Sequence, residues 1–190
     1  METVGILAVQ GAFIEHEHIL HRLGAETVQL RQKSDLYKDF DRLVLPGGES
    51  TVQGKLLKDF GMSGILKEKI ENGMPVLATC AGLILLAEKI SNDTNAYFKT
   101  LPVTVKRNAY GRQLGSFHCD GIIKGLGRFP MEFIRAPYIE AAGSGVEVLA
   151  ETDGKITAVR YKNQIGLSFH PELCEDDRLH RMFLNLSCSC

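Results

Sequence analysis

The hydrophobic and polar residues of this chain form short apolar runs that alternate with amphipathic stretches. Val4 to Val9 is typical of a buried strand, and Phe13 to Leu23, closed by Gly24, is typical of a helix. Further strands are predicted at 27–30 and 43–45, and a further helix at 63–72. Strands that alternate with helices predict an α/β fold, a doubly wound and mostly parallel sheet flanked by helices.

Beyond Thr100 the pattern changes to short strands separated by glycine turns. The strands predicted there are Pro102 to Lys106, Val146 to Ala150, Ile156 to Tyr161 and Gln164 to Phe169. No linker, repeat or low-complexity segment divides the chain, and 190 residues suffice for one substantial core. We therefore expect a single domain over 1–190, with the additional short strands in its C-terminal half.

Cys80 lies at the junction of a predicted strand and a predicted helix. The apolar run that ends in Ala78-Thr79 predicts the strand, and a second run, rich in Leu and Ala, continues to Lys89 and predicts the helix. A reactive residue followed by x-Gly at such a junction is the layout of a nucleophile elbow. Amide groups at the start of the helix would stabilise a thiolate. The alternative is a small buried apolar cysteine, and the local pattern alone does not separate the two.

His170 and Glu172 follow a predicted strand far along the chain. Pro171 biases His170 toward extended geometry, in which residues i and i+2 point to the same side. A carboxylate beside a histidine fixes its tautomer and stabilises the imidazolium, so that the histidine can act as a base toward a thiol. A lone His-Pro-Glu is more often an ordinary loop, but its combination with a Cys elbow is much more specific.

Two glycines, Gly47 and Gly48, separate a short apolar strand from residues that can cap a helix, Glu49-Ser50-Thr51. Adjacent glycines allow the backbone to approach a ligand closely. Their N–H groups, with the amide of Ala81 after the nucleophile, are candidates for an oxyanion hole. A phosphate-binding loop is the competing interpretation, but no Gly-Lys-Ser/Thr follows.

Composition sets limits on the class of protein. The chain is 44% hydrophobic and 24% charged, with a formal net charge of −1, so nothing favours binding to nucleic acid or to a membrane surface. We see no signal peptide and no apolar stretch long enough to span a bilayer. Five irregularly spaced cysteines argue for a reducing compartment, and we expect a cytoplasmic protein.

A metal site and a cofactor are not predicted. Histidines and glutamates gather at Glu15-His16-Glu17-His18 and His21, but they form no His-Glu-x-x-His motif. Faces rich in Glu are usually solvated. The tail, with Cys188 and Cys190, lacks zinc-ligand spacing.

Several motifs together resemble the triad-type (class I) glutamine amidotransferases, and in finer detail the glutaminase subunit of pyridoxal 5′-phosphate synthase. The resemblance covers nearly the whole chain, to about Leu173. It rests on Leu45-Pro46-Gly47-Gly48-Glu49-Ser50-Thr51, Thr79-Cys80-Ala81-Gly82-Leu83, Arg107-Asn108-Ala109-Tyr110-Gly111-Arg112-Gln113, Phe133-Ile134-Arg135-Ala136-Pro137 and Ser168-Phe169-His170-Pro171-Glu172-Leu173. Val9-Gln10-Gly11-Ala12 and Glu15-His16 also fit.

The resemblance implies a role for each matching residue. Cys80 would be the nucleophile, His170 the general base and then acid, and Glu172 the residue that orients it. The glutamine site would be formed by Gly47, Gly48, Glu49, Arg107, Ile134 and Arg135, with Arg107 meeting the substrate α-carboxylate. An arginine suits that task because its planar fork matches a carboxylate, although arginines more often form surface ion pairs.

The family also implies a pathway and a partner. L-Glutamine would be hydrolysed through a γ-glutamyl thioester, and the ammonia would pass to a separate synthase subunit that builds pyridoxal 5′-phosphate in vitamin B6 biosynthesis. Gln10, Glu15 and His16 would face that partner. Two departures from the family pattern are Ala78, where glycine is usual, and His118, where an acid is usual.

Two other classes of function stay open at this point. The same elbow would serve a γ-glutamyl peptidase, or the amidotransferase arm of another pathway. A catalytically silent regulatory subunit is the second alternative, against which the complete set of Cys80, His170 and Glu172 argues.

Overall fold

A computed structural model of the chain describes residues 2–108 and 116–187. The motif residues 109–113 and the tail cysteines Cys188 and Cys190 lie outside the described residues. The helices are α1 (Phe13–Arg22), α2 (Ser50–Asp59), α3 (Ser63–Glu71), α4 (Ala81–Leu86) and α5 (Arg178–Leu184), with short 3-10 turns η1 (Lys33–Tyr37) and η2 (Pro171–Leu173). The strands are β1 (Thr3–Leu7), β2 (Glu26–Leu30), β3 (Arg42–Leu45), β4 (Val76–Thr79), β5 (Ala87–Ile90), β6 (Leu101–Lys106), β7 (Ser116–Ile123), β8 (Gly127–Ile134), β9 (Tyr138–Ala142), β10 (Glu147–Thr152), β11 (Lys155–Tyr161) and β12 (Gln164–Leu167).

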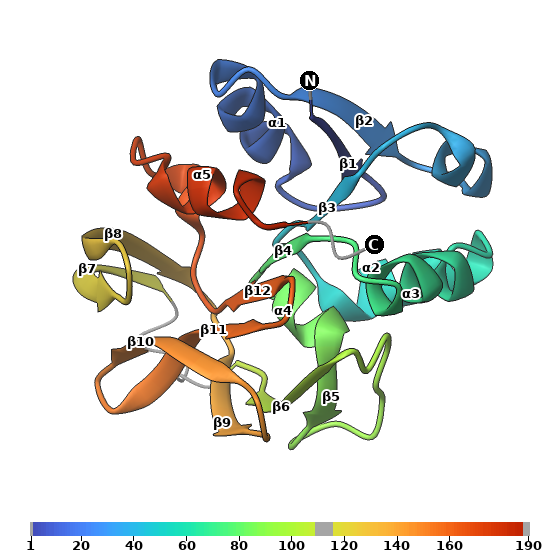
Figure 1. Ribbon diagram of the computed structural model, residues 1–190. Coiled ribbons are helices and arrows are strands. Elements are labelled where there is room, and N and C mark those ends of the chain that lie inside the picture. The colour runs from blue at the N-terminus through green and yellow to red at the C-terminus, as the bar shows by residue number, and fades with distance from the viewer. Residues whose placement is uncertain (1, 109–115, 188–190) are drawn as a thin grey trace.

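The described strands form one large sheet and one separate hairpin (Figure 1). The large sheet has the order β2-β1-β3-β4-β12-β11-β9-β6-β5, with β10 paired to β11. The pairs from β2 through β12 are parallel, and β12–β11, β11–β9 and β9–β6 are antiparallel. The hairpin consists of β7 and β8. The predicted fold class, a mostly parallel sheet with short strands added in the C-terminal half, is confirmed.

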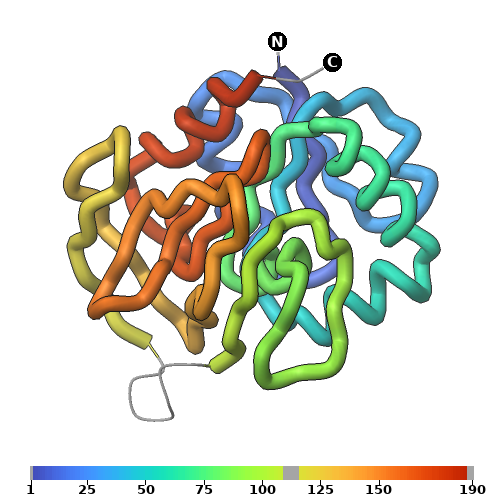
Figure 2. The backbone as a smooth tube through the Cα atoms, turned by 60° about the horizontal axis from the view of Figure 1, so that its bottom comes forward, coloured from blue at the N-terminus to red at the C-terminus, as the bar shows by residue number. Residues whose placement is uncertain are grey.

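Helices cover both faces of the parallel half of the sheet, as Figures 1 and 2 show, with α1 and α5 on one face and α2 and α3 on the other. Strand β3 shows why. Its residues Leu43 and Leu45 belong to the same buried cluster as Leu57 of α2, whereas Val44 between them belongs to the cluster that contains Phe183 of α5. Burial on both faces explains why these strands are continuous apolar runs without polar alternation.

Several elements differ from those that the pattern predicts. The apolar run after Cys80 is helical only to Leu86, and its last residues form β5 instead of a longer helix. Leu- and Ala-rich runs do not distinguish a buried helix from a buried strand. The segment after His170 is the 3-10 turn η2 rather than extended chain. The hairpin β7–β8 was not predicted, because β7 alternates exposed and partly buried residues and carries few apolar side chains.

Candidate active site

Cys80 lies in the sharp turn between β4 and α4. Its φ of +47° falls in the left-handed region, which a residue with a Cβ rarely adopts and which costs free energy unless the surroundings enforce it. The residue is 6% exposed, and Sγ lies 3.9 Å from the carbonyl oxygen of Ile134. The predicted elbow geometry is therefore present. Ala78 does not prevent it, because this alanine lies fully buried in β4, in regular register between Leu45 and Gly166.

His170 and Glu172 lie next to Cys80, as their motif predicts, although through a different backbone conformation. The turn η2 brings Nδ1 of His170 to 2.7 Å from Oε1 of Glu172. Both residues are 6% exposed, and the His170 ring also makes a hydrogen bond with Cys80. A carboxylate, an imidazole and a thiol therefore lie in series, the arrangement in which the base is oriented by a third group.

Hydrogen bonds and burial act in opposite directions on the ionisation of this pair. Burial lowers the pKa of His170, but the hydrogen bonds to Cys80 and Glu172 outweigh it and raise the pKa to about 10. Burial raises the pKa of Glu172, but the neighbouring His16 and His170 hold it below its ordinary value. The site thus favours an ionised Glu172 beside a protonated His170.

A pocket of about 370 Å³ opens above Cys80 and His170. All six residues predicted for the glutamine site line it: Gly47, Gly48, Glu49, Arg107, Ile134 and Arg135. Sequence reasoning missed four further lining residues, namely Ala12, Ser50, Ile84 and Asn108. For Ile84 a signal existed, because it lies four residues after Cys80, one helical turn along α4.

The Gly47-Gly48 loop is held against the first loop of the chain. The N–H of Ala12 donates to the carbonyl oxygen of Gly47 at 3.0 Å, and the N–H of Glu49 donates to Oε1 of Gln10 at 2.9 Å. A Cβ added at Gly47 would overlap the ring of His170. Glycine is therefore required at Gly47 so that the backbone can approach the imidazole. Ala81, the third residue predicted for the oxyanion hole, is buried at the start of α4, directly after Cys80.

The two arginines of the pocket already have acidic neighbours. Arg107 donates from Nη1 to Oδ2 of Asp93 at 2.7 Å, and both side chains are less than one fifth exposed. Nη1 of Arg135 lies 4.0 Å from Oε1 of Glu49, on the solvent side of the pocket. Arg107 therefore forms an ion pair, which was the alternative considered from the sequence, and it also lines the pocket, as the family resemblance implies.

The residues predicted to face a partner do not lie on one surface. Glu15 is exposed, and Gln10 is partly buried at the pocket, where it holds Glu49. His16 is fully buried beneath α1, so the predicted partner contact through this side chain is wrong. The helical period explains the error, because His16 shares the buried face of α1 with Ile19 and Leu20. His118, the other departure from the family pattern, pairs with Glu132 on the hairpin at 2.6 Å.

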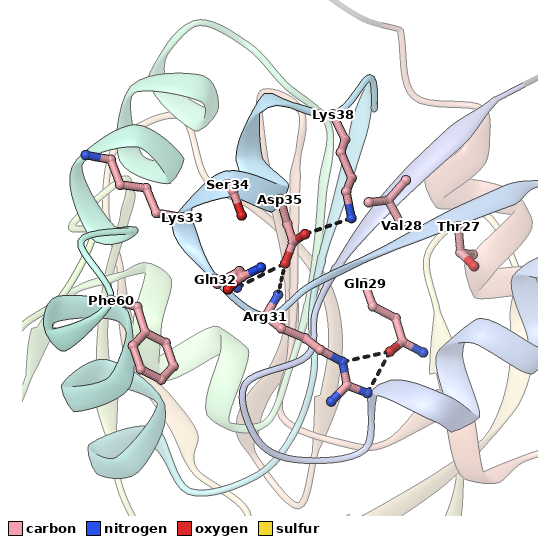
Figure 3. A pocket seen from close by; sticks show the side chains of 10 residues that line it. All are labelled: Thr27, Val28, Gln29, Arg31, Gln32, Lys33, Ser34, Asp35, Lys38 and Phe60. Atoms are coloured by element: carbon pink, nitrogen blue, oxygen red, sulfur yellow. Dashed lines mark hydrogen bonds and ion pairs between the residues drawn. The ribbon is translucent and has the colours of Figure 1, made fainter.

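A second and more open cleft, of about 930 Å³, lies beyond the end of β2 (Figure 3). Its polar side chains are largely engaged with one another: Arg31 donates to Gln29, and Lys38 pairs with Asp35 at 2.7 Å. Among the described residues that line it there is neither a cysteine nor a histidine. Over 2–108 and 116–187 no group of three potential metal ligands comes together, and no helix there is long and apolar enough to cross a membrane.

Comparisons with known proteins place these observations in a family. A sequence model of the SNO glutamine amidotransferase family matches residues 6–188. Curated relatives include proteins described as "Pyridoxal 5'-phosphate synthase subunit PdxT". The one from Desulfitobacterium hafniense (strain Y51) is 64% identical over 96% of this chain and 92% of its own. The one from Streptococcus pneumoniae (strain ATCC 700669 / Spain 23F-1) is 50% identical over 96% of each chain.

Solved structures agree with this family. A chain described as "Crystal structure of glutamine amidotransferase" superposes with a TM-score of 0.91 at 44% identity, over 96% of this chain and 97% of that one. PurLQS from Thermotoga maritima superposes with a TM-score of 0.72 at 16% identity, over 97% of this chain and 98% of that one, which shows a shared fold alone.

Proposed function

The chain belongs to the SNO glutamine amidotransferase family, and from that premise we propose that it hydrolyses L-glutamine to L-glutamate and ammonia with Cys80, His170 and Glu172. One observation carries the proposal for these residues. A buried cysteine with a left-handed backbone lies beside an imidazole that a buried carboxylate orients, at the base of a pocket with an arginine in its wall.

The chemistry follows from the placement of these groups. The Cys80 thiolate attacks the side-chain amide carbon of glutamine, and a bond forms between Sγ and that carbon. Amides of Gly47 or Gly48 and of Ala81 stabilise the oxyanion. His170 gives its proton to the departing nitrogen as the C–N bond breaks, which leaves a γ-glutamyl thioester. His170 then takes a proton from water, whose oxygen replaces Sγ and releases glutamate.

We further propose that the ammonia is delivered to a pyridoxal 5′-phosphate synthase subunit. The names of relatives at 50% and 64% identity support this partner. Of the residues predicted to face it, the exposed Glu15 and the partly buried Gln10 remain candidates. We place the reaction in the cytoplasm, supported by the cysteines Cys80, Cys119 and Cys174, none of which is in a disulfide.

A glutaminase assay with and without the synthase subunit of the same organism tests the function. We expect release of ammonia and glutamate from L-glutamine in the presence of that subunit, and much slower release of glutamate from γ-glutamyl peptides and from ester analogues. Preference for a γ-glutamyl peptide would show that the elbow serves a peptidase. No turnover of any of these substrates, together with an unreactive Cys80, would show a silent regulatory subunit.

Arg107 is expected to determine substrate affinity rather than turnover. Loss of a charge-assisted hydrogen bond costs about 1.5–3 kcal/mol, so Arg107→Ala should raise KM for glutamine roughly 10- to 100-fold while kcat changes much less. Asp93→Asn is the matched control, because it removes the ion pair but keeps the arginine in the pocket. Steady-state kinetics of both variants show whether Arg107 binds the substrate. An equal rise in KM for both variants would mean that Arg107 has only a structural role.

A further inference from the structure

A chain of buried polar side chains continues beyond Glu172, away from the pocket. Nε2 of His16 on α1 lies 3.4 Å from Oε2 of Glu172 and 3.3 Å from Oγ1 of Thr79, the residue before Cys80. Nδ1 of His16 lies 2.9 Å from Nε2 of His180 on α5. His16, Thr79 and His180 are all fully buried. Segments up to 164 residues apart in sequence therefore meet behind the triad.

The geometry fixes the direction of the hydrogen bonds in this chain. A neutral imidazole has one N–H and one acceptor nitrogen. If Nε2 of His16 lacked the proton, its lone pair would face the carboxylate of Glu172, which is repulsive. Nε2 of His16 therefore carries the proton, and Nδ1 accepts one from Nε2 of His180. Nδ1 of His180, which makes no hydrogen bond to any described residue, is then a bare acceptor, which costs less to bury than a bare N–H.

The ionisation of both histidines agrees with this assignment. Burial lowers the pKa of His16, although Glu172 acts in the opposite direction. Burial also lowers the pKa of His180, to about 3. The titratable and charged groups that act on the pair from the surrounding elements are Glu172, His170, Glu15, Asp177 and Arg22. Both rings are therefore neutral at neutral pH. This agrees with the hydrogen-bond assignment, in which each ring has one N–H donor and one acceptor nitrogen.

We propose that His16 is a positioning residue, whose Nε2–H, 3.4 Å from the second oxygen of Glu172, attracts that oxygen electrostatically so that the first oxygen faces His170. His180 fixes the tautomer in which His16 can do so. A buried carboxylate needs donors to remain ionised. His170 supplies one donor to Oε1. Oε2 makes no hydrogen bond to any described residue, and Nε2 of His16, which contacts Thr79 beside the nucleophile, lies 3.4 Å from it. The expected effect on kcat rests on the proposed glutaminase function. The expected effect on the His170–Glu172 pair does not.

His16→Gln and His16→Met are a matched pair of variants. The two side chains have nearly the same length, but only the glutamine amide offers a donor and an acceptor, as the neutral imidazole does. Without the donor, Glu172 loses stabilisation of its charged form and in turn stabilises the His170 imidazolium less. For His16→Met we expect kcat for glutamine to fall about 10- to 100-fold with KM within twofold, the scale of loss seen when the residue that orients a metal-binding histidine is removed. His16→Gln should recover most of kcat.

The decisive measurement does not require turnover. An NMR titration of proteins labelled with ¹⁵N at histidine, with the signal assigned through a His170 variant, gives the pKa of His170, about 10 in the intact site. We expect it to fall by roughly one unit or more in His16→Met and to recover in His16→Gln. A His170 titration and a kcat that are the same in His16→Met and His16→Gln would overturn the proposal.

A second variant keeps the proposal testable if His16→Met does not fold. His180→Met leaves His16 in place but removes the donor that fixes its tautomer, so kcat and the His170 pKa should move in the same direction by a smaller amount. Unchanged values of both in folded His180→Met would overturn the proposal. The failure of the proposed function would look different: wild-type protein would not release ammonia from glutamine, whereas the NMR titration would still report on the Glu172 site.

Discussion

Cys80→Ala is expected to abolish glutamine hydrolysis, with a loss in kcat on the order of 10⁴-fold or more, the scale seen when the nucleophile of a triad is removed. Among the described residues no other thiol can substitute, because neither Cys119 nor Cys174 lines the pocket. The residual rate would be that of glutamine held in the pocket without covalent catalysis. The measurement is ammonia release from L-glutamine in the presence of the synthase subunit.

The same substitution should leave the fold and the binding of the partner nearly unchanged. Alanine keeps the Cβ, so the left-handed φ of +47° costs it no more than it costs cysteine. Only the buried Sγ is lost, which costs about 1 kcal/mol, or a fall in melting temperature of about 2–4 °C for a chain of this size. Cys119→Ala, on the β7–β8 hairpin, is the control and should keep full activity. Normal turnover in Cys80→Ala would refute the assignment of the nucleophile.

The chemistry of the site was easier to predict from sequence than its supporting structure. An elbow cysteine, a glycine pair and a His-x-Glu motif each have local signatures, because backbone conformation and nearest neighbours determine what they can do. The strands that carry them were predicted for the same reason, since burial on both faces leaves a continuous apolar run. The pairing of His170 with Glu172 was correct even though its predicted backbone conformation was wrong, because a 3-10 turn also brings the two side chains within hydrogen-bonding distance.

The buried histidine pair was not predicted, and its physical basis explains why. His16 lies in a run of charged and polar residues that is typical of a solvated surface, and His180 lies in a short helix with no motif. Only the packing of α1 and α5 on the same face of the sheet brings the two rings to a centroid distance of 5.1 Å. A local pattern contains no information about a contact across 164 residues. The hairpin β7–β8 was missed for a related reason, since cross-strand pairing and not its own composition stabilises it.

Gly82→Ala is expected to destabilise the protein strongly, because α4 packs directly on the end of β3. A Cβ at Gly82 would overlap the carbonyl oxygen of Leu45 and lie 2.8 Å from its carbonyl carbon. Backbone atoms of a strand in the parallel sheet cannot rotate away as a flexible side chain would. We expect a loss of about 3 kcal/mol or more, which corresponds to a fall in melting temperature of roughly 6–12 °C, or failure to accumulate as folded protein.

Gly64→Ala in α3 is the matched control, because a Cβ there would meet no atom within 4 Å beyond its chain neighbours and the backbone of its own helix. Replacing a helical glycine with alanine stabilises the helix by about 0.5–1 kcal/mol, so the melting temperature of Gly64→Ala should rise by about 1–4 °C. The melting temperature of Gly82→Ala is compared with that of wild type and of Gly64→Ala. A value for Gly82→Ala within about 2 °C of wild type would contradict close packing of α4 on β3.

The clash at Gly82 also has a catalytic consequence. Relief by movement of α4 would displace Cys80 at its start, and relief by movement of β3 would displace Gly47 two residues after Leu45. Whatever fraction of Gly82→Ala folds should therefore hydrolyse glutamine more slowly than Gly64→Ala does.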